Sequence, residues 1–370
     1  MVEFKKIKNI TTIGIADISG TGLSAIFWLY LATLMEPEAY GEISYYIGIA
    51  TMGAAFATIG TANTITVFTS KNIKIESTLY FLSLVFAAIV SLILIFWFFR
   101  TDIVLLIFAY VINIMAIGEL LGKKAFTNYS VHFLIQKGLT LILGLTFYFI
   151  FGAEGIIFAL GISYVSYIII VLKQFKSSKI NFKLLKERSG FILNNYLYYV
   201  VAKSNSHLNR LIIVAILGFS VLGNFSLAMQ MIMVVMTLPS IIFKYTLPHD
   251  AQGTKNIYLK KLTIIFSIII SLLGSLLFPF LILHIFPKYI EVIEPIQIMS
   301  FGIIPMTITT IYTSELLGNE KSRQLVISKI VSLIVFVSLI VILGSTYGII
   351  GLAIGFLVSM IVETLCLIRK

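Results

Sequence analysis

The sequence is poor in the residues that carry most soluble protein chemistry. Among 370 residues there is one cysteine, Cys366, so no disulfide can form within the chain. Spacings typical of CxxC motifs, zinc sites, phosphate-binding loops and nucleophile elbows are absent. Charged residues make up 12% of the chain, against about 25% in soluble domains. We therefore expect no metal site, no cofactor and no enzyme activity.

Apolar residues are abundant instead. They form 59% of the chain, and the mean hydropathy is +1.03, which predicts an integral membrane protein. The net charge of +11 lies in alternate loops, which favours a membrane over nucleic acid as its explanation. The start of the chain resembles a signal segment, but its apolar run is too long and contains Asp17. We interpret it as an uncleaved first span.

Apolar runs of about 20 residues or more, the length needed to cross a bilayer, predict an all-α polytopic fold. The twelve candidate spans cover approximately 10–34, 42–69, 78–99, 103–121, 130–151, 155–172, 189–217, 221–247, 261–286, 292–317, 324–343 and 346–368. The one long polar connection, 173–188, is basic. It predicts an N-terminal six-helix lobe (1–172) and a C-terminal six-helix lobe (189–370), joined by this cytoplasmic linker.

Positive charges alternate from side to side in the twelve-span interpretation. Only two fall on one side, Arg100 and Lys288. The other side holds Lys5, Lys6, Lys8, Lys71, Lys74, Lys123, Lys124, the six cations of the linker, Lys255, Lys260, Lys261, Lys321, Arg323, Arg369 and Lys370. Because lysine and arginine accumulate in cytoplasmic loops, both termini are predicted to be cytoplasmic, in a protein of the cell membrane.

The two halves repeat in parallel. Three motifs recur at corresponding positions: GEIS at 41–44 with GNFS at 223–226, ELLG at 119–122 with ELLG at 315–318, and GII at 155–157 with GII at 348–350. Repeated lobes around a central site are typical of transporters. Proline is unevenly distributed, with Pro239, Pro279 and Pro305 inside spans of the second half, so we expect the bent helices there.

One span carries charge that lipid would not accept. Five polar residues spaced by three or four positions share one helical face: Tyr196, Tyr199, Lys203, His207 and Arg210. Lys203 lies roughly 20 Å into the span, where a cation costs at least about 2.5–3.5 kcal/mol. We predict that this face lines an anion-accepting cavity. The alternative is that Lys203 and Arg210 pair with acids or carbonyls inside a packed lobe, and that His207 is a neutral packing residue.

Other spans add candidates for the same cavity. Asp17 and Trp28 share a face of the first span, where Asp17 would pair with a cation or bind a coupling proton or sodium ion. The alternative is a hydrated acid near the cytoplasmic end. Lys137, Lys244 and Lys329 lie within two turns of predicted cytoplasmic ends, where lysine stems can also reach water. We include Lys137 in the cavity. The repeat-related Glu119 and Glu315 favour structural contacts or a cytoplasmic gate.

Three stretches, 34–71, 208–248 and 286–355, together resemble one family. Their most specific parts are PEAYG at 37–41 with Gly60, Asn209-Arg210 followed by Gly223, and Gly318 with Gly348 and Gly351. They resemble the oligosaccharide-lipid (O-antigen type) flippases, or polysaccharide biosynthesis proteins, of the multidrug/oligosaccharidyl-lipid/polysaccharide (MOP) superfamily. Asn209 and Phe225 depart from the aspartate and tyrosine usual there.

The resemblance implies two six-helix lobes in a MATE-like V that alternate between inward-open and outward-open states. It implies movement of a polyprenyl-diphosphate-linked oligosaccharide from the cytoplasmic to the outer leaflet for cell-surface glycan assembly. Lipid II flippases of the superfamily are expected to have two further C-terminal spans, which argues against a peptidoglycan precursor. The alternatives are a cation-coupled multidrug extruder, which would need acids in its cavity, and a glycan polymerase or ligase, which would need a large outer loop.

Overall fold

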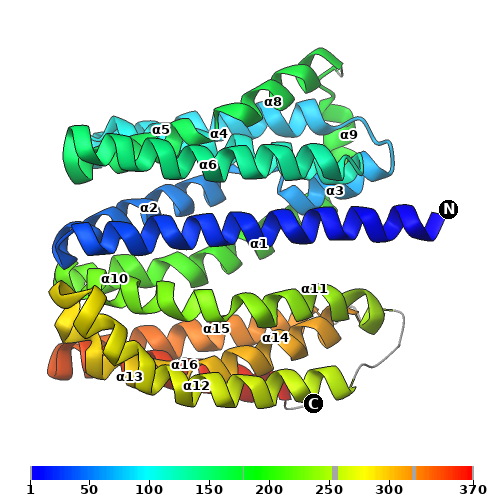
Figure 1. Ribbon diagram of the computed structural model, residues 1–370. Coiled ribbons are helices and arrows are strands. Elements are labelled where there is room, and N and C mark those ends of the chain that lie inside the picture. Colours follow the sequence, from blue (N-terminus) through cyan, green and yellow to red (C-terminus); the bar gives the residue numbers. More distant parts are fainter. Residues whose placement is uncertain (1, 178, 252–256, 319–321, 369–370) are drawn as a thin grey trace. The chain divides into compact units, whose positions relative to one another are not determined.

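The computed structural model describes residues 2–177, 179–251, 257–318 and 322–368, which form helices and no strand in these ranges (Figure 1). The helices are α1 (Val2–Leu34), α2 (Pro37–Ala57), α3 (Ala62–Ser70), α4 (Glu76–Phe98), α5 (Thr101–Gly122), α6 (Phe126–Phe151), η1 (Gly152–Glu154), α7 (Gly155–Ser163), α8 (Val165–Ser177), α9 (Phe182–Glu187), α10 (Ser189–Val235), α11 (Thr237–Ala251), α12 (Ile257–Ile285), η2 (Pro287–Val292), α13 (Ile293–Ser300), α14 (Ile303–Gly318), α15 (Ser322–Leu339), the π-turn η3 (Ile340–Gly344) and α16 (Ser345–Ile368).

Membrane-spanning length is met repeatedly. Within the described ranges eight helical segments are long and apolar enough to cross a bilayer, and the bent pair Pro287–Ser300 and Ile303–Leu316, at 46°, makes a ninth. Three of the eight run for 46 to 51 residues, about twice the length that one crossing needs. Each contains a glycine with positive φ, at Gly152, Gly218 or Gly348. Interpreting these three as two crossings each agrees with the predicted twelve, and the all-α polytopic fold class is confirmed.

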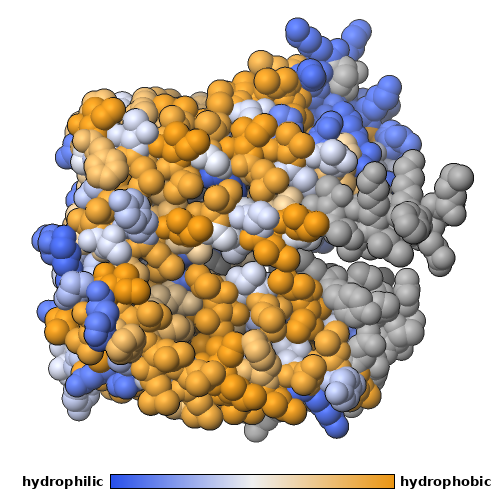
Figure 2. Space-filling view, in the orientation of Figure 1, coloured by the Kyte–Doolittle hydropathy of each residue, from blue (hydrophilic) through white to orange (hydrophobic). Residues whose placement is uncertain are grey.

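The surface has the polarity of a membrane protein. Hydrophobic residues cover most of the visible face over the middle of the helices, and hydrophilic residues gather at helix ends, most densely over α8 and α9 (Figure 2). Large apolar side chains stay exposed along the lipid-facing helices, such as Leu92 at 69% and Leu276 at 70% exposure. Such a surface suits hydrocarbon as solvent, and the chain is a multi-pass membrane protein.

Two compact units make up the chain. Unit 1 comprises Met1–Phe27 and Tyr46–His207, and unit 2 comprises Trp28–Tyr45 and Leu208–Lys370. In unit 1, α5 packs against α3, α4, α7 and α8, and in unit 2, α14 packs against α11, α12 and α16. The two units are defined by the contacts of one conformation, whereas transporter lobes are defined by which segments move together. The two ways of dividing the chain need not agree. The predicted lobes 1–172 and 189–370, joined by the linker 173–188, therefore stay a prediction.

Helix breaks occur in both halves, whereas we expected the bent helices in the second half. The helix pair bent by 46°, Pro287–Ser300 and Ile303–Leu316, does lie in the second half, but the break between α2 and α3 was not predicted. In the first half, α2 ends at Ala57 and α3 begins at Ala62 without any proline between them. The Thr61 hydroxyl caps α3 by accepting from the Thr64 amide at 3.2 Å, and the Gly60 amide donates to Ser83 Oγ at 3.3 Å. Hydroxyl groups thus satisfy the backbone that a broken span exposes, which is the condition for a break at membrane depth.

The internal repeat is present, but the predicted match of Gly155 with Gly348 is displaced by three residues. Gly152 and Gly348 both have positive φ, 70° and 56°. Three residues later, at Gly155 and Gly351, an added Cβ would lie 2.7 Å and 2.0 Å from the carbonyl oxygen eight residues earlier in the chain. Gly155 therefore corresponds to Gly351 and not to Gly348.

Buried serines support this later register. Ser163 and Ser359 are both fully buried, and each hydroxyl donates to the carbonyl three residues earlier at 2.7 Å. They fall at the same distance from the paired glycines. The sequence alone did not distinguish the two registers, because a shift of three residues is close to one helical turn. Glycines and apolar residues therefore fall on almost the same face in both registers.

Candidate functional site

The polar face predicted for the seventh span lies on α10, with every one of its five side chains partly buried. Tyr196 donates its hydroxyl to the Phe56 carbonyl at 2.8 Å, which fixes that end of the face within unit 1. Two turns along, the Lys203 ammonium lies 5.8 Å from the centre of the Tyr199 ring. A cation over an aromatic ring is attracted by the ring quadrupole, but only weakly compared with a carboxylate.

The end of the same face belongs to unit 2 at Arg210. Its Nη1 donates to the Ser44 carbonyl at 3.0 Å, so part of the guanidinium is engaged by the protein. His207 lies one turn earlier on this face and is also partly buried. Tyr196 and Arg210 therefore have structural contacts, and their cavity role stays a prediction.

The second group of candidates joins α1 and α6 in unit 1. The Tyr129 hydroxyl donates to Asp17 Oδ1 at 3.1 Å. A Cβ added at Gly20 would lie 2.3 Å from the Phe133 ring, so the two helices are in close contact here. Lys137 lies one turn beyond Phe133, with its ammonium 5.4 Å from the ring centre. Asp17 and Lys137 thus occupy the same α1–α6 contact.

Trp28 lies in unit 2, in a series of edge-to-face aromatic contacts. Its ring centre is 6.1 Å from that of Tyr40, which is in turn 6.1 Å from that of Tyr289. Both pairs are close to perpendicular, the arrangement that aromatic quadrupoles favour. Tyr40 and Tyr289 are almost fully buried, whereas Trp28 is partly exposed. The Trp28 ring therefore has a packed edge and an accessible surface.

Several lysines elsewhere in the helices have acid partners. Lys260 Nζ lies 2.7 Å from Asp250 Oδ1 and 3.0 Å from Glu315 Oε1. Lys329 pairs with Glu363, a carboxylate that is 1% exposed. The Lys329 side chain is 45% exposed, which agrees with the prediction that its stem reaches water, and the acid partner is an addition to that prediction. The side chain of Lys244 lies outside the described residues.

Lys137 and Lys203 differ from these lysines. Neither ammonium has a carboxylate of the described residues within ion-pair distance, and the contact of each is an aromatic ring one turn earlier. A cation in a span without a compensating anion is unfavourable in a closed lipid environment. It is accounted for where the side chain borders water or an anionic ligand. These two lysines are the strongest members of the predicted set.

Three buried charges were missed by sequence reasoning. Lys260 was placed in a cytoplasmic loop, but it belongs to α12, is 5% exposed and pairs with Asp250. Glu76 begins α4, is 5% exposed and accepts a hydrogen bond from the Thr69 hydroxyl at 2.9 Å. The only available signal was the ELLG repeat, which marks the helix ends where these groups gather.

The repeat-related glutamates make structural contacts, one of the two roles predicted for them. Glu119 is 3% exposed, accepts from the Tyr80 hydroxyl at 2.7 Å and pairs with Lys123. Glu315 pairs with Lys260 in unit 2. Each acid lies near the end of its helix. Glu119 bonds to Tyr80 near the start of α4, and Glu315 pairs with Lys260 near the start of α12. The buried acid is therefore a shared feature of both units.

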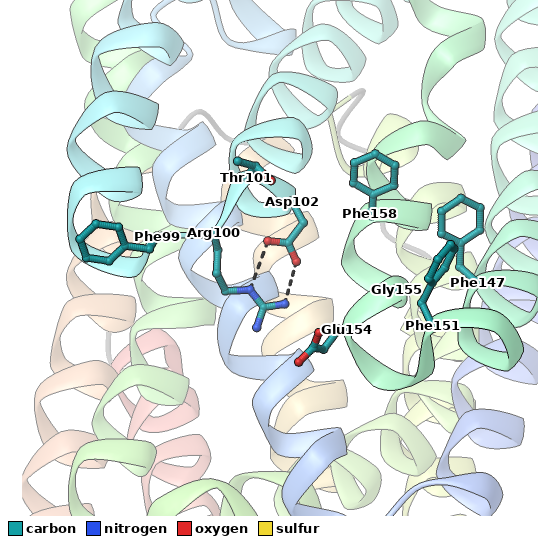
Figure 3. Close-up of a pocket in the computed structure, with 9 residues that line it drawn as sticks. All are labelled: Phe99, Arg100, Thr101, Asp102, Phe147, Phe151, Glu154, Gly155 and Phe158. Atoms are coloured by element: carbon teal, nitrogen blue, oxygen red, sulfur yellow. Dashed lines mark hydrogen bonds and ion pairs between the residues drawn. The ribbon is translucent and has the colours of Figure 1, made fainter.

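A pocket of about 500 Å³ opens at the other end of unit 1, between α4–α5 and α6–α7. Figure 3 shows Arg100 extending to Asp102, with the Glu154 carboxylate beside them and phenyl rings around the space. The Arg100 Nη2 to Asp102 Oδ2 distance is 2.7 Å. Because Asp102 balances the guanidinium, this pocket offers no uncompensated cation for an anion. It is distinct from the predicted cavity residues.

Comparison with known proteins identifies the fold. No protein-family model matches the sequence, and no curated protein matches it significantly. Solved structures do match. The lipid II flippase MurJ in an inward closed conformation aligns with a TM-score of 0.76 at 14% identity, over 96% of this chain and 86% of that chain.

Two multidrug or related transporters match as well. An outward-facing multidrug resistance MATE family transporter of the MOP superfamily has a TM-score of 0.67 at 16% identity, over 97% of this chain and 93% of that one. A MOP superfamily transporter from Pyrococcus furiosus, described by a binding pocket of reverse polarity that suggests a different function, has a TM-score of 0.63 at 15% identity, over 97% and 94%. The chain therefore has the MurJ and MATE transporter fold.

Proposed function

We propose that this protein is a flippase that moves a polyprenyl-diphosphate-linked oligosaccharide from the cytoplasmic to the outer leaflet of the cell membrane, for cell-surface glycan assembly. The observation that carries the proposal is the pair Lys137 and Lys203, two cations within spans without a carboxylate partner among the described residues. The MurJ and MATE fold supplies the transport framework. The lobes 1–172 and 189–370 would alternate between inward-open and outward-open states.

The chemistry of the substrate matches these residues. A diphosphate is a dense anion, and Lys137, Lys203 and Arg210 are its natural partners. Sugar rings present apolar faces that stack on aromatic side chains, a role for Tyr196, Tyr199 and Trp28. His207, between Lys203 and Arg210, would donate to a phosphate or sugar oxygen.

Cavity polarity favours this substrate over a drug-like cation. Solved structures of this fold include a lipid II flippase, a multidrug transporter and a transporter whose pocket has reverse polarity. An extruder of organic cations needs anionic groups where this chain has Lys137 and Lys203. Asp17 is the one acid of the predicted set, and its Oδ1 already accepts from Tyr129. The balance of charge points to an anionic substrate.

Asp17 and Tyr129 have a separate role in the proposal, which is coupling. A carboxylate within a span can take a proton or sodium ion, and the Tyr129 hydroxyl would hold the Asp17 side chain in position through its hydrogen bond to Oδ1. Substrate would then bind at the lysines while the coupling ion binds at Asp17.

The test is transport in reconstituted vesicles. A fluorescent prenyl-diphosphate oligosaccharide would be followed with a membrane-impermeant reagent that reports its leaflet. Lys137→Gln and Lys203→Gln should each slow transport by about tenfold or more, because each removes a charge-assisted contact to phosphate. Lys137→Arg and Lys203→Arg should keep most of the rate. Lys173→Gln, an exposed lysine of α8, is the matched control and should have the parental rate.

The outcomes separate function from site. If both glutamine variants transport at the parental rate, the flippase function would be supported and the lysine site would be rejected. Absence of lipid movement together with proton- or sodium-driven efflux of an organic cation would assign the chain to the multidrug extruders. Extension of the glycan itself by the purified protein would indicate a polymerase or ligase.

A further inference from the structure

A polar pocket of about 540 Å³ lies at the end of unit 1 where α3, α5 and α8 end and α4 begins. Its lining residues include Glu76 and three lysines, Lys74, Lys123 and Lys124. Lys123 is neutralised by Glu119, whereas Lys74 and Lys124 have no acid partner among the described residues. The positive-inside pattern puts this end of the helices at the cytoplasmic surface of the membrane.

Glu76 is incompletely satisfied. It is 5% exposed, and one carboxylate oxygen accepts from the Thr69 hydroxyl at 2.9 Å. The other, Oε2, is buried and takes no hydrogen bond from any described residue. A buried carboxylate oxygen without a donor is destabilising, and natural proteins rarely leave one. Glu76 lines the pocket, so a ligand that displaces the side chains covering Oε2 can supply this donor.

The corresponding place in unit 2 shows which donor is missing. There two buried acids, Asp250 and Glu315, share the ammonium of Lys260. In unit 1 the lysine of the cluster, Lys123, pairs with Glu119 and not with Glu76. Unit 2 thus completes its acid cluster with an ammonium of its own. In unit 1 the second acid, Glu76, has no lysine partner among the described residues, and it lines a pocket.

We propose that this pocket binds the headgroup of an amine-bearing phospholipid of the phosphatidylethanolamine type from the cytoplasmic leaflet. The primary ammonium would donate to Glu76 Oε2, and the phosphate would lie between Lys74 and Lys124. The site is separate from the proposed transport cavity, and the headgroup would be a bound lipid and not cargo.

Headgroup chemistry makes the proposal specific. A primary ammonium has three N–H donors, and a trimethylammonium has none, so phosphatidylcholine cannot satisfy Oε2 by hydrogen bonding. Phosphatidylglycerol offers the phosphate without the positive charge that a buried carboxylate needs. The lysines recognise the phosphate of every phospholipid, whereas Glu76 selects the amine.

The experiment measures lipid binding to the purified full-length protein by native mass spectrometry. The probes are phosphatidylethanolamine, its N,N-dimethyl derivative, phosphatidylcholine and phosphatidylglycerol with the same acyl chains, together with soluble phosphoethanolamine. The variants are Glu76→Gln and Lys74→Gln/Lys124→Gln. The matched control is Lys71→Gln, an exposed lysine of the same turn that does not line the pocket. Thermal unfolding of each variant checks that it is folded.

We expect the parent to bind phosphatidylethanolamine about tenfold more tightly than phosphatidylcholine, from one hydrogen bond to a charged group, with the dimethyl lipid between them. Glu76→Gln should abolish this preference and leave phosphatidylglycerol binding unchanged. Lys74→Gln/Lys124→Gln should weaken all four lipids and keep the preference, and Lys71→Gln should change neither.

Three results would overturn the proposal. One is a parent that binds phosphatidylethanolamine and phosphatidylcholine equally. Another is a folded Glu76→Gln variant that keeps the preference. The third is phosphoethanolamine binding as tight as that of the lipid, which would assign the pocket to a soluble phosphoamine. None of these depends on transport, so the flippase proposal would stand or fall separately.

Discussion

At the scale of single residues, the ion pairs of unit 2 show how this protein tolerates buried charge. Lys260 donates to both oxygens of Asp250, at 2.7 and 2.8 Å, and Ser314 adds a hydrogen bond to the same carboxylate at 2.6 Å. Each charge is therefore compensated within one cluster. Removing one member of such a cluster is far more destabilising than replacing the whole cluster.

Lys260→Met should therefore lower the free energy of unfolding by about 3–5 kcal/mol, because it leaves two carboxylates without their cation. Thermal unfolding of the purified protein in detergent would measure the loss. The neighbouring Lys261→Met is the control, since Lys261 is exposed and should change stability little. Equal stability of the two variants would show that the cluster contributes nothing.

At the scale of helices, two repeat-related glycines make one close contact in unit 2. A Cβ at Gly41 in α2 would lie 1.9 Å from the Phe219 carbonyl oxygen, and one at Gly223 in α10 would lie 1.8 Å from that of Pro37. Backbone atoms cannot rotate away as a side chain can. The GEIS and GNFS motifs thus recur because each supplies the small residue that the other helix needs.

Gly41→Ala and Gly223→Ala should each destabilise the protein by at least about 2 kcal/mol through backbone overlap. Gly138→Ala in α6 is the matched control, because nothing lies within 4 Å of its added Cβ. Gly138→Ala should stabilise the protein by up to about 1 kcal/mol, because alanine favours a helix interior more than glycine does. Stability of the variants in detergent would be compared, and a tolerated alanine at Gly223 would contradict the close approach.

The turn within α10 depends on glycine for a different reason. Gly218 has φ 84° and ψ 177°, a region open almost only to glycine, and its added Cβ would touch nothing. Gly218→Ala should therefore destabilise by about 1–3 kcal/mol through backbone strain alone. Hydrogen exchange at the residues flanking 218 would localise the effect. Unchanged protection there would show that the turn accepts an alanine.

At the scale of the whole molecule, orientation in the membrane is the property to test. In a Cys366→Ser background, single cysteines would replace the exposed residues Glu154, between α6 and α7, and Glu187, in the linker. The positive-inside pattern predicts that a membrane-impermeant maleimide labels Glu154→Cys in intact cells and Glu187→Cys only after permeabilisation. The opposite pattern would invert the topology and the direction of transport. Lys255, Lys321, Arg369 and Lys370, four cations used for the orientation, lie outside the described residues.

Much of the fold could be predicted because membrane spans are local. A run of apolar residues long enough to cross a bilayer must form a helix whatever its neighbours do, since lipid leaves no other way to satisfy the backbone. Helix breaks were less predictable. The α2–α3 break has no proline and depends on Ser83, a residue of another helix.

The candidate site divides in the same way. The sequence by itself determined that cations such as Lys137 and Lys203 lie within spans, because their positions along apolar runs are readable directly. Only the tertiary structure decided which of them is compensated, since Lys260 meets a carboxylate 55 residues away at Glu315 while Lys203 meets only a ring on its own helix. Charge is a property of a residue, but compensation depends on which residues folding brings together.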